Sequence, residues 1–367
     1  MSDPRVDALA QLLVHYCCEV EAGQTVTIGS STVAEPLVMA TYEEVLRAGG
    51  LPTVNLTMAD QSAAYFKYAN EEQLAWVPPA AKWASEEADA TIRILADFNT
   101  KELSEVDPAK QGKRHRAMRP LMKRSMERSA GGSLKWALTI YPTHAYAADA
   151  EMSLRDYEDF YYRACLTDQP DPIAAWKRQS EEARRLAEWI EGREEVHITA
   201  PGTDIKLGIS GRKFIVADGK RNMPDGEFFT GPIEDFTEGE ITYTYPAVYG
   251  GREVAGVRLR FKEGRVVDLS ADRNEEYLRE MLETDPGASI LGELGIGTNF
   301  GIDRFTKEGL LDEKIGGTIH LAVGAAYPET GGVNDSAVHW DMVCDLRRGG
   351  KIVVDGEEMQ VDGQFVV

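Results

Sequence analysis

The sequence predicts a chain of two parts, an N-terminal α/β domain built on a parallel sheet and a C-terminal α+β domain that is mostly antiparallel β. In the first half, short apolar β-rich segments alternate with helical patterns, which is typical of parallel strands connected through helices. In the second half, short β-rich segments follow one another with glycine between them, which favours antiparallel hairpins. The 367 residues are enough for two domains with a core each.

The first domain is expected to cover residues 1–192. Helices are predicted where apolar residues recur at helical spacing, over 5–18, 34–48 and 173–189. Strands are predicted over 23–29, 52–56, 90–96 and 133–141. The last helix ends near Gly192, and a glycine commonly follows a helix, so we place the domain boundary there.

The second domain is expected to cover residues 193–367. Turn residues with glycine predict hairpins at Asp218-Gly219 and Glu263-Gly264, and two short C-terminal strands joined at Asp355-Gly356. One helix, over 274–283, is expected to interrupt the strands.

The charge of the chain argues against nucleic acid and membrane partners. Lys and Arg number 40 against 61 Asp and Glu, a net charge of −21, whereas nucleic acids and anionic membranes attract positive surfaces. A basic stretch over 110–128 lacks interleaved aromatic residues, so we interpret it as a solvated helix face or a salt-bridge surface between domains. No apolar run reaches the ~18 residues that a membrane-spanning helix needs.

The cysteines indicate a reducing compartment. Cys17, Cys18, Cys165 and Cys344 have neither metal-site nor disulfide spacing, and we expect them to be buried free thiols. The N-terminus lacks a positive segment followed by a long apolar run, so no signal peptide is predicted. Together these features predict a cytoplasmic protein.

Candidate metal ligands are concentrated between Gly292 and Asp341. His339 and Asp341 are two residues apart, which puts both side chains on one side of an extended strand. His320 lies in a second alternating segment and faces away from its apolar neighbours. Glu293 lies between glycines, where we expect a sharp turn that aims the carboxylate inward. Two imidazoles and two carboxylates suit Zn, Mn, Fe or Co.

Four segments carry a resemblance to a known family. They are NMPDGEFFTGP (222–232), LGELGIGTN (291–299), DEKIGGTIHLAVGAAYPETGG (312–332) and SAVHWDMV (336–343). Together they resemble the thermophilic-type metalloaminopeptidases, the aminopeptidase T and aminopeptidase S family. The resemblance is specific over 222–345 and weaker upstream. It implies an N-terminal α/β domain, a C-terminal domain on a curved antiparallel sheet, and a homodimer that encloses the site.

The resemblance also implies a site for two divalent ions, Zn, Co, Mn or Mg. Matched by motif, the metal ligands are Glu227, Glu293, His320, His339 and Asp341, with Tyr327 beside the ions. We expect Glu227 to bridge the ions, Glu293 to act as a ligand or general base, and the Tyr327 hydroxyl to stabilise an oxyanion. The segment between Tyr327 and His339 is shorter than we expect for the family, which affects the shape of the substrate pocket.

The predicted function is a metal-dependent aminopeptidase, in which a metal-activated water hydrolyses the N-terminal residue from a small peptide. An alternative is an enzyme of the same scaffold that acts on a small aromatic molecule, either an Fe(II) ring-cleaving dioxygenase or an aminohydrolase. His320, His339 and Asp341 alone make the two-His-one-carboxylate set of such an Fe(II) site. A metal-stabilised binding protein is a third possibility. The presence of both Glu227 and Glu293 favours the hydrolase.

Overall fold

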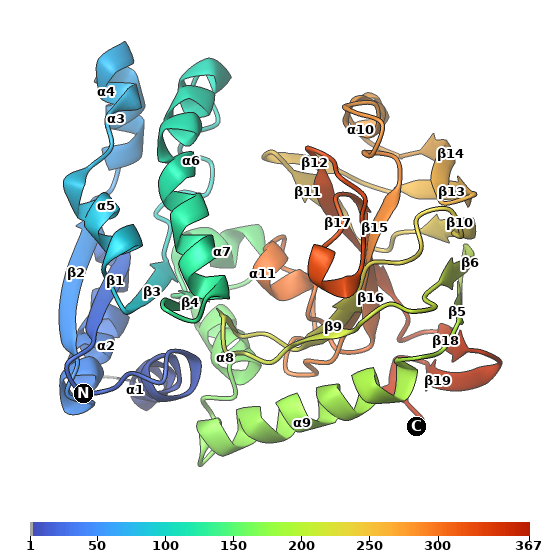
Figure 1. Cartoon of the computed structure of the whole chain (residues 1–367), viewed down its shortest axis with the longest axis horizontal. Helices are drawn as coiled ribbons and strands as arrows, with labels where there is room; N and C mark the ends of the chain where they lie inside the picture. Colours follow the sequence, from blue (N-terminus) through green and yellow to red (C-terminus); the bar gives the residue numbers. More distant parts are fainter. Residues whose placement is uncertain (1–2) are drawn as a thin grey trace. The chain divides into compact units, whose positions relative to one another are not determined.

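The computed structural model describes residues 3–367, which form two compact units (Figure 1). One unit contains the described residues up to Ile173 together with Gly219–Pro224, and the other contains Ala174–Asp218 and Asp225–Val367. The predicted fold class is confirmed, because the first unit carries a parallel sheet and the second carries antiparallel sheets. The division into residues 1–192 and 193–367 stays a prediction about which parts of the chain fold independently.

The first unit is organised around a five-stranded parallel sheet of order β2-β1-β3-β4-β8. Its strands are β1 (Thr25–Ser31), β2 (Leu51–Thr57), β3 (Ala90–Leu95), β4 (Lys135–Ile140) and β8 (Asn222–Met223). The predicted strands and the connecting helices are therefore present, with bounds shifted by a few residues.

The helices of the first unit connect these strands in the α/β manner. They are α1 (Pro4–Gln11) with the π-helix Leu12–Cys17, the 3-10 turn Thr32–Ala34, α2 (Glu35–Arg47), α3 (Gln61–Tyr68), α4 (Glu71–Ala75), α5 (Pro79–Glu86), α6 (Pro108–Ala130), α7 (His144–Asp149) and α8 (Leu154–Ala164). All four cysteines of the chain are buried thiols outside any disulfide, as predicted. No helix among residues 3–367 is long and apolar enough to cross a membrane.

The predicted hairpin at Asp218-Gly219 is wrong. After β7 (Ile215–Ala217) the chain does not turn back directly, because the next strand, β8, pairs in parallel with β4 of the other sheet. Only after β8 does the chain return, as β9 (Glu227–Thr230), which pairs antiparallel with β7. The Tyr161 hydroxyl donates to the Met223 carbonyl oxygen at 3.1 Å, which helps to hold this segment against the first unit. A turn signal shows where the chain bends but not which sheet the following strand joins.

The second unit contains two large antiparallel sheets. Their orders are β14-β13-β10-β6-β5-β18-β19-β20 and β17-β16-β15-β9-β7, and β11 and β12 form a separate ribbon. The strands are β5 (Glu195–Ala200), β6 (Thr203–Gly208), β7 (Ile215–Ala217), β9 (Glu227–Thr230), β10 (Glu238–Thr242), β11 (Ala247–Tyr249), β12 (Arg252–Val254), β13 (Arg258–Lys262), β14 (Arg265–Ser270), β15 (Leu291–Gly297), β16 (Thr318–Gly324), β17 (His339–Asp345), β18 (Lys351–Val354), β19 (Glu357–Val361) and β20 (Gln364–Phe365). The predicted hairpins β13-β14 and β18-β19 are confirmed.

The core of the second unit joins both sheets and its longest helix. That helix is α9 (Pro172–Ile190), and three shorter segments, α10 (Glu275–Leu282), α11 (Gly309–Asp312) and the 3-10 turn Pro328–Thr330, lie between strands. One buried cluster contains Leu186 of α9, Ile198 of β5, Leu259 of β13, and Leu321 and Trp340 of the five-stranded sheet. One face of the five-stranded antiparallel sheet of this unit therefore belongs to the core. The side chains on its other face are not part of that core.

The basic stretch lies on α6 and is only partly a solvated helix face, because Lys110, Lys113 and Arg114 are half-buried and bond to the segment 66–76. Arg128 is buried and donates to three backbone carbonyl oxygens, those of Ser85 (3.2 Å), Ala88 (2.8 Å) and Ser133 (2.9 Å). Its guanidinium thereby connects the ends of α5 and α6 to the starts of β3 and β4.

Replacing this arginine is expected to destabilise the first unit. Arg128→Met leaves buried carbonyl oxygens without a donor, so the free energy of unfolding falls by about 3 kcal/mol. Urea unfolding followed by circular dichroism measures the change. Arg124→Met, at a side chain that is 52% exposed, is the matched control and changes stability by less than about 0.5 kcal/mol. Equal stabilities for the two variants would contradict the role assigned to Arg128.

Candidate metal centre

Five ligand-type side chains lie on the face of the five-stranded sheet that is turned away from the core. Along each strand the residues alternate between faces, so the core receives Phe228, Leu294, Leu321 and Trp340. The neighbouring positions on the opposite face are Glu227 of β9, Glu293 of β15, His320 of β16, and His339 and Asp341 of β17. Four strands thus bring together residues more than a hundred positions apart in the sequence.

Small residues in the middle of the sheet make room for these side chains. Ala322 of β16 pairs with Glu293 on one side and with Asp341 on the other, so both carboxylates extend over a methyl group. Gly295 pairs with His320, and a Cβ atom on Gly295 would lie 1.9 Å from Cε1 of the imidazole. The His320 ring therefore occupies the place of a missing side chain.

The expected sharp turn at Glu293 is wrong, because Glu293 lies inside β15. The pairing of β15 with β16 instead shifts between Leu291 and Glu293, which is a β-bulge at Gly292. The bulge lets Leu291 enter the core while Glu293 stays on the opposite face. Gly292 is needed there, because a Cβ atom would lie 2.3 Å from the carbonyl oxygen of Gly324.

Both histidines are oriented in the same way by backbone carbonyl groups. His339 Nδ1 lies 2.7 Å from the carbonyl oxygen of Ala325, and His320 Nδ1 lies 3.2 Å from that of Glu313. A carbonyl oxygen only accepts, so each Nδ1 donates and Nε2 of each ring is left to face the carboxylates. Nε2 offers a lone pair to a metal once the ring is neutral. Metal-bound histidines are typically fixed by such a contact.

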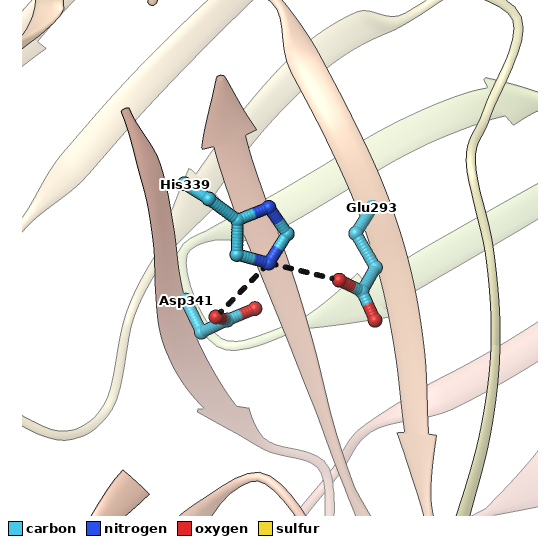
Figure 2. Close-up of side chains that lie close together, drawn as sticks. All are labelled: Glu293, His339 and Asp341. Atoms are coloured by element: carbon cyan, nitrogen blue, oxygen red, sulfur yellow. Dashed lines mark ion pairs between the residues drawn. The ribbon is translucent and has the colours of Figure 1, made fainter. Parts of the chain in front are cut away.

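The two Nε2 atoms face the same carboxylates. His339 Nε2 lies 3.1 Å from Glu293 Oε2 and 3.3 Å from Asp341 Oδ2 (Figure 2). His320 Nε2 lies 3.5 Å from Glu293 Oε1, 3.9 Å from Asp341 Oδ1 and 3.4 Å from Glu227 Oε2. Glu293 and Asp341 therefore each direct one oxygen towards each histidine, whereas Glu227 is close to His320 only.

The carboxylates make this place strongly attractive to positive charge. Burial by itself lowers the pKa of His320, but the charge of Glu227 and the other carboxylates raises it to about 10. For His339 the same competition, with Asp341 and Glu293 as partners, raises the pKa to about 11. Burial raises the pKa of Asp341, but the hydrogen bond from His339 and the charge of His320 outweigh it, so the pKa is lowered.

The residues present fit a divalent cation. Glu293, His339 and Asp341 offer ligand atoms that all lie within 4.8 Å of one another. Among the described residues, Glu227 Oε2 and Asp341 Oδ1 are buried without a hydrogen-bond partner. Buried carboxylate oxygens of this kind are costly unless they bind a cation or a donor. Two imidazoles and three carboxylates are the donor set that Zn and related metals accept.

Two residues beside this group were not found from the sequence. Lys314 Nζ lies 2.9 Å from Glu227 Oε1 and 2.6 Å from Glu313 Oε2, and its side chain is only 3% exposed. Burial lowers the pKa of this lysine, but both glutamates more than compensate and raise it well above its ordinary value. Both residues belong to the DEKIGG segment, where charged residues at a turn resemble ordinary surface residues.

Tyr327 lies at the edge of the group. Its ring packs edge-on to His339 with 5.2 Å between ring centroids, and its other neighbour is Phe229 at 5.3 Å. Burial and the charges of Glu293 and Asp341 raise the pKa of the Tyr327 hydroxyl well above its ordinary value. The hydroxyl therefore keeps its proton at neutral pH and is able to donate it in a hydrogen bond.

The fold and the donor set define a protein with a metal-binding site on an antiparallel sheet, and comparison with known proteins identifies its class. The model of the family described as thermophilic metalloprotease (M29) matches residues 2–365. The chain therefore belongs to this family of metal-dependent hydrolases, as the sequence predicted.

Relatives of known name cover almost the whole chain. Aminopeptidase 2 of Geobacillus stearothermophilus is 28% identical over 97% of this chain and 95% of its own length. Aminopeptidase T of Thermus thermophilus is 27% identical over 98% of this chain and 94% of its own length. The solved structure of wild-type AmpT from Thermus thermophilus superposes with a TM-score of 0.85 and 25% identity over 99% of each chain.

A second solved structure shares the fold only. It is 2,5-dihydroxypyridine dioxygenase from Pseudomonas putida, with a TM-score of 0.58 and 16% identity over 100% of this chain and 99% of the other. The similarity of this enzyme shows that the architecture is common to both proteins, and it carries no conclusion about activity.

The contact between Gly295 and His320 gives a test of the site's construction. Gly295→Ala forces the imidazole away from the carboxylates, so the affinity for a divalent metal is expected to fall about 10–100-fold. Calorimetric titration of the metal-free protein with Zn²⁺ measures the affinity. Gly29→Ala is the control, because a Cβ atom there meets nothing within 4 Å. Unchanged affinity in Gly295→Ala would show that His320 does not bind the metal.

Proposed function

We propose that the protein is an aminopeptidase that removes the N-terminal residue of peptides at a site for two divalent ions. The observation that carries this proposal is the arrangement of the histidines. Each is anchored through Nδ1 to a backbone carbonyl and presents Nε2 to a shared pair of carboxylates. Family membership and the names of the relatives support the choice of peptides as substrates.

In this proposal the five ligands form two overlapping sets. His339, Glu293 and Asp341 would hold one ion, and His320 and Glu227 would hold the other together with Glu293 and Asp341. Glu293 is then the better candidate for a bridge than Glu227, which we expected from the sequence. Glu227 has one oxygen occupied by Lys314 and only the other directed at a histidine.

The chemistry is amide hydrolysis. Divalent ions held by these five residues would supply a water of lowered pKa and stabilise the negative charge that develops on the attacked carbonyl. The Tyr327 hydroxyl, which keeps its proton, donates a hydrogen bond to that developing oxyanion. The metals are Zn, Co, Mn or Mg. The alternative dioxygenase is not favoured, because the likeness to the solved dioxygenase is limited to the fold and because Glu227 and Glu293 join the two-His-one-carboxylate set at this site.

We also propose a homodimer in the cytoplasm. The family resemblance supports the dimer, and four buried thiols without a disulfide agree with a reducing compartment. Sedimentation equilibrium is expected to give twice the mass of the 40.6 kDa chain, and a monomer would contradict the dimer.

Metal counting tests the function directly. The purified protein is expected to bind two divalent ions per chain and to release free amino acids from peptides with an unblocked N-terminus. Treatment with a chelator is expected to abolish this activity and addition of Zn, Co, Mn or Mg to restore it. One iron per chain and oxygen uptake with an aromatic substrate would overturn the proposal in favour of the dioxygenase.

The assignment of separate ligand sets predicts a specific loss in His339→Ala. This variant is expected to keep one ion per chain, held by the His320 set, and to lose activity at least about 100-fold. Elemental analysis gives the metal content, and circular dichroism checks the fold. His197→Ala is the control, because His197 pairs with Asp204 on the eight-stranded sheet. A variant that retains two ions and full activity would refute the ligand role of His339.

A further inference from the structure

A cavity of about 130 Å³ borders the candidate metal centre within the second unit. His339 and Asp341 belong to its wall, on the same face of β17 as Val343. Residues of β11 and of the segment around α11 form the rest of the wall, with Val248 and Phe305 among them. A molecule in this cavity touches the metal centre on one side, and on the other it meets apolar side chains together with Lys307 and Asp312.

Glu313 is a carboxylate of this wall that the metal centre does not use. It follows α11 directly, and its backbone carbonyl accepts from Nδ1 of His320. Its side chain is 25% exposed, and Oε2 is held by Lys314 at 2.6 Å. Oε1 lies beside Gly309, which also lines the cavity, and it has no hydrogen bond to any described residue.

Lys314 fixes where this carboxylate is directed. Its ammonium group lies between Glu227 and Glu313, and burial keeps the lysine from exchanging these partners for water. The side chain of Glu313 is therefore held next to the metal ligands without being one of them. One carboxylate oxygen with an open hydrogen-bonding position is left at the cavity.

We propose that Glu313 Oε1 accepts a hydrogen bond from the α-ammonium group of the peptide substrate. This assignment rests on the aminopeptidase function proposed above and adds the group that recognises the free N-terminus. Removal of single terminal residues requires a group that fixes the N-terminus at a set distance from the attacked carbonyl, and a carboxylate does this by a charge-assisted hydrogen bond to the ammonium group. Glu313 supplies a carboxyl group on the wall shared with His339 and Asp341.

Glu313→Gln tests the proposal with an unblocked aminoacyl p-nitroanilide as substrate. The variant is expected to bind two ions like the wild type and to show a KM about tenfold higher or more, with kcat changed only a few-fold. Glu313→Asp, which restores the charge, is expected to recover part of the loss. Glu276→Gln removes one exposed carboxylate of α10 and serves as the control with unchanged KM.

A pair of inhibitors separates the ammonium group from the rest of the substrate. In the wild type, 3-methylbutylamine is expected to bind about tenfold more tightly than 3-methylbutan-1-ol, and Glu313→Gln is expected to abolish this preference. A preference that survives in the variant, a loss confined to kcat, or a loss of bound metal would overturn the role of Glu313 while leaving the aminopeptidase function intact. Failure of the wild type to release amino acids would overturn both.

Discussion

The alternation of side chains along a β-strand is the constraint on which the site depends. Phe228, Leu294, Leu321 and Trp340 fill the core from one face of the five-stranded sheet, and this burial fixes the register of each strand. A slip of one residue would put the core residues on the site face and the ligands into the core. The hydrophobic packing that stabilises the second unit therefore also positions the five polar side chains on its opposite face.

The dependence of the site on side-chain alternation explains which parts of it could be predicted from the sequence. The two-residue spacing of His339 and Asp341 and the alternation around His320 are local patterns, and they placed these side chains on one face correctly. The bulge at Gly292 and the fit of His320 over Gly295 are properties of two paired strands, so no single segment shows them. The parallel sheet was predicted from the alternation of β-rich and helical segments along the chain. The pairing of β8 with β4 was not predicted, because β8 has only two residues and lies far from β4 in the sequence.

Lys314 and Glu313 were missed for an electrostatic reason. A charged residue at a turn is normally solvated, and sequence gives no sign that Lys314 is buried between two carboxylates. Removing an ammonium group from water is costly unless it is paired, and here both glutamates compensate. The lysine occupies one oxygen of Glu227 and one of Glu313, and so it determines which oxygen each glutamate has left for other partners.

Because a dioxygenase shares this fold, the chemistry has to be assigned from the metal-ligand side chains and not from the architecture. The dioxygenase of Pseudomonas putida has the same overall topology at 16% identity, so fold alone is compatible with different reactions. Three carboxylates, Glu227, Glu293 and Asp341, surround two histidines, and Lys314 offsets only part of their charge. With Lys314 counted, the three carboxylates leave two negative charges, which are unfavourable in a buried site unless a divalent ion neutralises them. The charge of the site therefore requires a divalent cation, whereas the second ion of the proposed site rests on the two overlapping sets of ligands.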